Sequence, residues 1–206
     1  QGSVPMDAGS SVIALKRIAR YLIGRPRMLF KYPWQEAFGG DFHADTDWAG
    51  CLRTRKSTTG CDLLIGKHLA KSWSSIQPSV TMSSGEAEMA GVTRAAAAAL
   101  GFRSLLADFG LEWPMRVWTD SSAFIRMCSR QGLGKVRHLD VQIMWIQQRI
   151  RQHDLDLYKV LGEENPADIM TKAGIPEDRI LHLIDLMGCR FVGGRAETAP
   201  TLRREG

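Results

Sequence analysis

The order of strand-like and helix-like segments constrains the fold of this 206-residue chain more than any other feature. Three consecutive segments have strand character, and a two-residue turn between the second and third predicts a hairpin. Two later strands each follow helical segments. This order predicts an α/β sheet that is antiparallel at one edge and parallel at the other. The expected elements are strands 41–48, 60–65 and 68–74, a helix from 83 to about 110, strand 115–119, helices 121–129 and 137–153, strand 155–160, and helices 166–172 and 176–187.

The composition narrows the range of partners. A formal net charge of +5 favours association with a polyanion without requiring it. No apolar run reaches the roughly 18 residues of a membrane-spanning helix, so no membrane partner is expected. The four cysteines form no Cys-x-x-Cys pair, which predicts reduced thiols rather than a disulfide framework or a zinc site.

A change in sequence character near residue 39 predicts a domain boundary. Residues 10–24 have apolar side chains at helical spacing, and residues 27–34 have strand character. A polar stretch that ends in two glycines follows, as in a hinge. The predicted divisions are an N-terminal extension at residues 1–38, a main domain at residues 39–190 and a flexible basic tail at residues 191–206.

Four carboxylates lie at positions that secondary structure alone does not explain. Asp45 lies inside a strand, where aspartate is disfavoured, and Asp120 directly follows a strand. Glu88 lies on an apolar helical stripe, where an unpaired carboxylate is costly, whereas Glu86 takes the third position of a capping box. Asp168 begins a short helix. Since paired Mg2+ ions on carboxylates can activate water against a phosphodiester, we predict that the four acids converge around magnesium as catalytic and metal-binding residues.

Each acid, taken alone, has another possible role. Asp45 is also consistent with a turn or cap. Asp47 faces the same side of the strand and is the second candidate for the first ligand. Asp120 is also typical of a helix N-cap, and Asp168 is typical of a first-turn acid that interacts with the helix dipole. The metal-binding hypothesis therefore depends on the four acids as a set.

Seven short motifs occur in a fixed order along the chain. They are DTDWAG (45–50), RKSTTG (55–60), KSWSS (71–75), SSGEAE (83–88), WTDSSA (118–123), RHLD (137–140) and ADIMTK (167–172). In these motifs the chain resembles the ribonuclease H domain of the Pol polyprotein of copia-type (Pseudoviridae) LTR retrotransposons, preceded by the C-terminal edge of the reverse transcriptase region. The resemblance extends from about residue 14 to residue 187.

The resemblance implies both a fold and a reaction. The implied fold is RNase H-like α/β, with a five-stranded mixed sheet of three antiparallel and two parallel strands flanked by helices. The implied reaction is hydrolysis of the RNA strand of RNA/DNA hybrids by a two-magnesium mechanism, with Mn2+ as an expected substitute. The motif acids correspond to Asp45, Glu88, Asp120 and Asp168 in this sequence.

The resemblance also implies partners and a location. The expected partners are an RNA/DNA hybrid and the reverse transcriptase domain of the same polyprotein, of which residues 1–38 would be the end. The expected location is the cytoplasmic virus-like particle of the retrotransposon.

Two polar, basic segments are candidates for contacts with the hybrid. Basic and hydroxyl side chains suit phosphate contacts, and the 2′-hydroxyl distinguishes the RNA strand. For each residue a solvated loop is the alternative. The candidates are Arg53, Arg55, Lys56, Ser57, Thr58, Lys135, Arg137 and His138.

Departures from the family pattern bear on activity. Ser121 replaces the asparagine that usually follows the third acid, which preserves the ligand. Residues 162–166 lack the histidine that bacterial and many retroviral relatives carry before the last acid, so slower turnover is expected. A catalytically degraded module that binds hybrid or tethers a polymerase is the alternative function, and the intact set of acids argues against it. A DNA-cutting integrase or resolvase is less consistent, because such sites usually end in glutamate rather than in Asp168.

Overall fold

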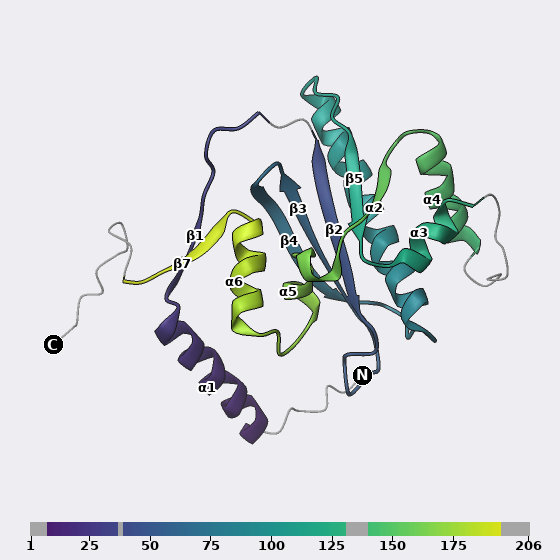
Figure 1. The fold of residues 1–206 in the computed structure, drawn as a ribbon. Coiled ribbons are helices and arrows are strands. Elements are labelled where there is room, and N and C mark those ends of the chain that lie inside the picture. Colours follow the sequence, from purple (N-terminus) through teal and green to yellow (C-terminus); the bar gives the residue numbers. More distant parts are fainter. Residues whose placement is uncertain (1–7, 37–38, 131–139, 195–206) are drawn as a thin grey trace. The chain divides into compact units, whose positions relative to one another are not determined.

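The computed structural model describes residues 8–36, 39–130 and 140–194, and the chain divides into two compact units (Figure 1). One unit combines the chain up to Phe30 with the chain from Cys189 onward, and the other unit is Lys31–Gly188. The predicted boundaries after residues 38 and 190 stay predictions. Residues 195–206, where most of the predicted tail lies, are outside the described residues.

The smaller unit consists of a helix and a two-stranded sheet. Helix α1 (Ala8–Gly24) and strand β1 (Arg27–Phe30) lie where the sequence predicted them, although the strand ends earlier than residue 34. β1 pairs antiparallel with β7 (Cys189–Val192), a strand that was not predicted. Tyr21 of α1 contacts Phe191 of β7 edge to face, with ring centroids 6.1 Å apart, and so ties the helix to the sheet.

The larger unit is built on a five-stranded sheet with the order β4-β3-β2-β5-β6. β2 pairs antiparallel with β3 and β3 with β4, whereas β5 pairs parallel with both β2 and β6. The predicted α/β class, with a mixed sheet of three antiparallel and two parallel strands, is therefore confirmed. The strands are β2 (Gly40–Asp47), β3 (Thr58–Ile65), β4 (His68–Ile76), β5 (Met115–Thr119) and β6 (Asp156–Lys159).

Helices cover both faces of this sheet (Figure 1). On one face, Phe42 of β2 lies in the apolar core with Val92 of α2. Because side chains alternate along a strand, Asp45 points to the opposite face, where Gly60 is its partner on β3 and α5 packs against that glycine. None of the described helices combines the length and apolar composition that a membrane span requires. The helices are α2 (Ser84–Asp108), α3 (Ser122–Cys128), α4 (Asp140–Arg151), the 3-10 helix η2 (Gly162–Glu164), α5 (Asp168–Thr171) and α6 (Glu177–Leu186).

Two glycines let helices approach the sheet closely. A Cβ atom at Gly91 of α2 would lie 2.3 Å from Oγ1 of Thr46, and a Cβ atom at Gly60 of β3 would lie 2.6 Å from Cβ of Met170. Both distances are far below van der Waals contact, so only glycine fits at either position unless the neighbouring atoms move. These contacts bring α2 against β2, which carries Asp45, and α5 against the neighbouring strand β3.

Candidate metal centre

Three of the four predicted acids meet where β2 and β5 cease to pair. The last paired residues of these two strands are His43 and Trp118, and Asp45 and Asp120 each lie two residues further along. Glu88 reaches the same place from the first turns of α2. One carboxylate oxygen of each of Asp45, Glu88 and Asp120 lies within 4.8 Å of the others. Side chains 43 and 32 residues apart along the chain are thereby brought into one cluster.

The two glutamates near the start of α2 have different roles. The backbone N–H of Glu86 donates to Oγ of Ser83 at 3.2 Å, and a carboxylate oxygen of Glu86 accepts from the N–H of Met82 at 2.7 Å. Glu86 therefore caps the helix, as the capping-box pattern predicted. Glu88 instead faces Asp45 and Asp120, and it is the glutamate that the sequence favoured over Glu86 as a metal ligand.

Burial makes the carboxylate of Glu88 costly to ionise in the absence of a cation. Loss of solvent, followed by the charges of Asp45 and Asp120, raises the pKa of Glu88 to about 8. Its Oε2 atom is buried and has no hydrogen-bond partner among the described residues. A buried oxygen without a donor, in a cluster made only of carboxylates, fits a hard divalent cation such as Mg2+. Asp45, Glu88 and Asp120 could together hold such an ion.

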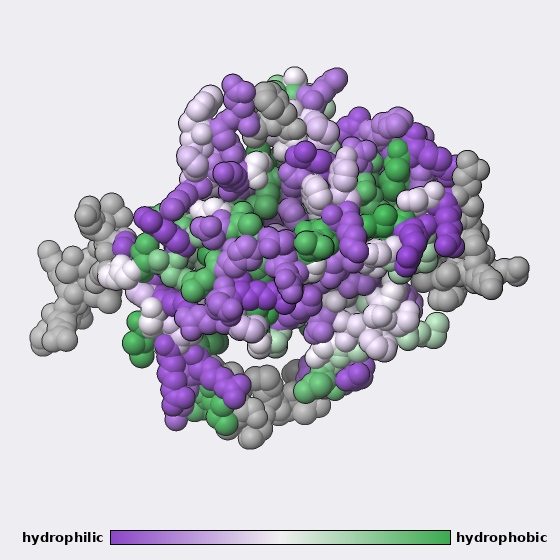
Figure 2. Space-filling view, viewed as in Figure 1, coloured by the Kyte–Doolittle hydropathy of each residue, from purple (hydrophilic) through white to green (hydrophobic). Residues whose placement is uncertain are grey.

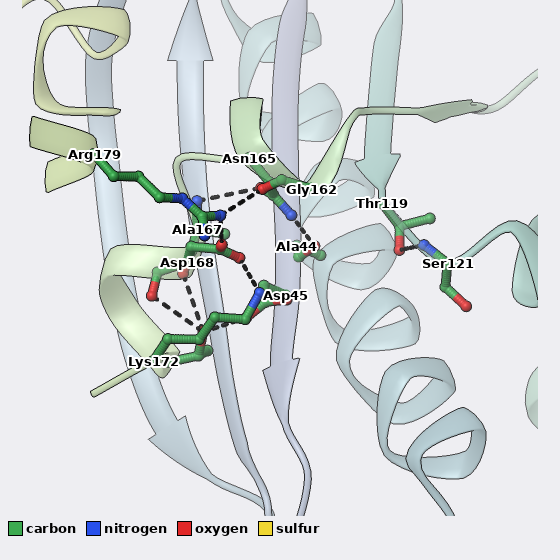
Figure 3. A network of polar contacts seen from close by, with 11 residues as sticks. Ala44, Asp45, Thr119, Ser121, Gly162, Asn165, Ala167, Asp168, Lys172 and Arg179 are labelled. Atoms are coloured by element: carbon green, nitrogen blue, oxygen red, sulfur yellow. Dashed lines mark hydrogen bonds and ion pairs between the residues drawn. The ribbon is translucent and has the colours of Figure 1, made fainter. Parts of the chain in front are cut away.

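The fourth predicted acid lies beside this cluster but is bound to cations of the protein (Figure 3). Asp168 is fully buried, and its Oδ1 atom accepts from Nζ of Lys172 at 2.6 Å. Its Oδ2 atom accepts from the guanidinium of Arg179. The same ammonium of Lys172 lies 3.4 Å from Oδ1 of Asp45, and the hydroxyl of Thr171 donates to Oδ2 of Asp45. Asp168 is thus linked to Asp45 through Lys172.

Opposing effects act on the ionisation of this second pair. Burial raises the pKa of Asp168, and the hydrogen bond from Lys172 acts against that rise. Burial would lower the pKa of Lys172, but its hydrogen bond to Asp168 and the charges of Asp45, Asp168 and Asp120 together raise it. The lysine is therefore a stable ammonium at neutral pH.

A buried asparagine holds the segment before Asp168 against the sheet (Figure 3). Nδ2 of Asn165 donates to the carbonyl of Ala44 at 3.0 Å, and the N–H of Ala167 donates to Oδ1 of Asn165 at 3.2 Å. Ala44 lies just past the paired part of β2 and β5, so Asn165 satisfies a backbone carbonyl that β5 does not reach. This contact places Asp168 near Asp45.

The structure distinguishes Asp45 from Asp47, the two candidates on β2 for the first ligand. The carboxylate of Asp47 lies against Gly50, where an added Cβ atom would be 1.7 Å from Oδ2 of Asp47. Asp45, and not Asp47, belongs to the cluster of three carboxylates. Asp120 does not cap α3, because Ser121 is the N-cap and its Oγ atom accepts from the N–H of Phe124 at 3.3 Å.

The predicted hybrid-binding residues have varied surroundings. Arg53 and Arg55 are exposed in the loop between β2 and β3. Ser57 is buried, and its hydroxyl accepts from the N–H of Ala49 at 3.1 Å and lies 3.1 Å from the hydroxyl of Thr81. The surface over α5 and α6 is mainly hydrophilic (Figure 2). Lys56 and Thr58 are partly exposed, whereas Lys135, Arg137 and His138 lie outside the described residues.

Sequence reasoning gave no role to several residues that shape this centre. Lys172 follows Asp168 by four residues, which is a spacing at which opposite charges on a helix meet. That spacing was the one local signal of its role. Arg179 and Asn165 act through contacts that no local pattern indicates, since Asn165 bonds to a carbonyl 121 residues away.

Known proteins resemble this chain in sequence and in fold. No known family model matches the chain. The chain is 30% identical over 183 residues to the retrovirus-related Pol polyprotein from transposon TNT 1-94 of Nicotiana tabacum, a match that covers 85% of this chain and 13% of that protein. It is 29% identical over 163 residues to the corresponding polyprotein from transposon RE1 of Arabidopsis thaliana, which covers 77% of this chain and 11% of that protein. The chain thus spans a small fraction of the length of these relatives.

A solved structure shares the fold of most of this chain. An RNase H1 isolated from compost, LC11-RNase H1, superimposes with a TM-score of 0.51 over 65% of this chain and 92% of its own length, at 18% sequence identity. At that identity the similarity concerns the fold alone.

Proposed function

Since the chain is a homologue of the Pol polyproteins of copia-type retrotransposons and has a ribonuclease H fold, we propose that it hydrolyses the RNA strand of RNA/DNA hybrids during reverse transcription. The observation that carries this proposal is the meeting of Asp45, Glu88 and Asp120 within 4.8 Å. Three ionised carboxylates this close together repel one another unless a cation binds between them. A purely structural role therefore does not explain the cluster.

The proposed cofactor is Mg2+, with Mn2+ as a substitute. Asp45, Glu88 and Asp120 would hold one ion. When bound, Mg2+ supplies a polarised phosphate oxygen and a water of lowered pKa. The protein's own residues orient the carboxylates: Asn165 fixes the strand beside Asp45, and Thr171 donates to the carboxylate of Asp45. A second ion of the two-magnesium mechanism would have to bind on the side of Asp168.

The proposed partners follow from the relatives and from the exposed basic loop. Arg53 and Arg55 lie in solvent on the loop that follows β2, whose Asp45 belongs to the cluster, and suit contacts with phosphates of the hybrid. The reverse transcriptase region of the same polyprotein is the proposed protein partner, and the cytoplasmic virus-like particle is the proposed location.

A cleavage assay with matched variants tests the proposal. Purified chain with Mg2+ should cut the labelled RNA of an RNA/DNA hybrid and leave RNA duplex and DNA duplex intact. Asp120→Asn should reduce cleavage to the level without metal and retain hybrid binding measured by fluorescence anisotropy. Asp156→Asn is the control, because this partly exposed acid on β6 is outside the cluster. Undiminished cleavage by Asp120→Asn would refute the assignment, and hybrid binding without cleavage at any metal concentration would favour the non-catalytic alternative.

A further inference from the structure

Lys172 lies between two of the predicted metal ligands. Its Nζ atom is 2.6 Å from Oδ1 of Asp168 and 3.4 Å from Oδ1 of Asp45 (Figure 3). Both carboxylates are buried, whereas the lysine side chain is 38% exposed. The ammonium thus enters an anionic site from the surface, and its partly exposed side chain allows it to withdraw without unfolding the site.

The contacts of the four acids are asymmetric. Every carboxylate oxygen of Asp45 and Asp168 has a cationic or hydrogen-bonding partner from Thr171, Lys172 or Arg179. Oε2 of Glu88 is buried and lacks a hydrogen-bond partner among the described residues. The cluster therefore has one side that the protein itself neutralises and one side that it does not.

The charges agree with this division. Once Glu88 is ionised, the four carboxylates together with Lys172 and Arg179 carry a net charge of minus two, which one divalent cation neutralises. Loss of the lysine charge would leave minus three, and a second divalent cation would then be attracted more strongly to the side of Asp168.

We propose that the ammonium of Lys172 occupies the position between Asp45 and Asp168 where a second divalent ion would bind. The ammonium must therefore be displaced before that ion binds. This inference rests on the proposed function, because it takes Asp45, Glu88 and Asp120 to hold the first ion. Lysine suits the role because its ammonium is a compact charge on a flexible stem. Arg179 is anchored by a second hydrogen bond to the carbonyl of Gly162, 2.8 Å long, and stays in place.

The test counts bound ions without substrate. The full chain and its variants are titrated with Mn2+, and free Mn2+ is measured by electron paramagnetic resonance. The wild-type chain should bind one ion tightly and a second weakly. Lys172→Met should lower the dissociation constant of the second ion by at least about tenfold, because a competing cation has been removed from a partly buried site. Lys172→Gln, which keeps a donor without the charge, should do the same.

Two controls separate charge from general disturbance. Lys172→Arg keeps the charge and should preserve the weak second site, and Lys67→Met removes a cation from the exposed turn between β3 and β4 and should change nothing. Unchanged second-ion binding in Lys172→Met and Lys172→Gln would overturn the proposal. Equal tightening in Lys172→Arg would also overturn it, because charge would not be the cause. A wild-type chain that binds no Mn2+ would instead refute the metal centre of the proposed function.

Discussion

Asp62, like Asp45, is a buried carboxylate on a strand of the sheet, but it lies outside the metal centre. It is fully buried on β3, and neither of its carboxylate oxygens has a hydrogen-bond partner among the described residues. Its neighbours Cys61 and Leu63 point into the core beneath α2, so Asp62 points to the other face of the sheet. Burial raises the pKa of Asp62 from its usual 3.8 to about 7.

This raised pKa predicts that the stability of the fold falls as pH increases. Between pH 4 and 7 the folded chain keeps the proton on Asp62 while the unfolded chain releases it, so the unfolded state binds fewer protons and gains stability relative to the folded state. The stabilisation is fully present below about pH 4 and is lost as pH rises through 7. A pKa rise of about 3 corresponds to about 4 kcal/mol at about 1.4 kcal/mol per pH unit.

Asp62→Asn isolates this contribution, because the amide has nearly the same shape and does not ionise. Urea unfolding of both proteins should be followed by tryptophan fluorescence from pH 4 to 8. The free energy of unfolding of the wild-type chain, minus that of Asp62→Asn, should fall by about 4 kcal/mol over this range. A constant difference between the two free energies of unfolding does not bear on the prediction, which concerns only how that difference changes with pH. The other acids are the same in both proteins, so their contributions cancel in the difference. If the curves of the wild-type chain and Asp62→Asn ran parallel from pH 4 to 8, the reasoning would be refuted.

Two further substitutions test how the centre is held together. Gly91→Ala would place a methyl group 2.3 Å from Oγ1 of Thr46, so it should lower the free energy of unfolding by about 1–3 kcal/mol and weaken Mn2+ binding. Gly101→Ala is the control, because its methyl group would enter open space and should stabilise α2 by up to about 1 kcal/mol. Equal effects of the two substitutions in urea unfolding would contradict the close approach of α2 to Thr46. Asn165→Ala should cost about 1–3 kcal/mol because it leaves the carbonyl of Ala44 buried and unpaired, and a loss below about 0.5 kcal/mol in the same measurement would show that the bond is not needed.

The fold of the larger unit was largely predictable because its signals are local. The turn before β4, the capping box of α2 and the change from strand to helix periodicity each fall within a few residues. Strand β7 was missed because it has four residues and its partner, β1, lies near the other end of the chain. No local pattern can indicate such a pairing.

The candidate site was predictable only in part, and Asp62 shows why. Asp45 and Asp62 both lie inside strands, where aspartate is disfavoured, so residue type alone does not tell them apart. The structure separates them by register: Asp45 lies beyond the last pair between β2 and β5, whereas Asp62 is paired on both sides, with His43 and with Ser72. Residue type and spacing therefore found the cluster of acids, but the cations that neutralise one side of it depend on tertiary contacts.

The division of the centre into two sides has a consequence for the metal-free chain. Lys172 and Arg179 already neutralise Asp168, so α5 and α6 can stay in place on the sheet without any ion. The cost of keeping the acids together falls instead on Glu88, whose Oε2 atom is buried without a hydrogen-bond partner among the described residues and whose pKa is raised to about 8. A cation bound by Asp45, Glu88 and Asp120 would relieve that cost without moving either helix. The geometry therefore favours a centre that is preformed before the first ion binds and that must change its contacts only for the second.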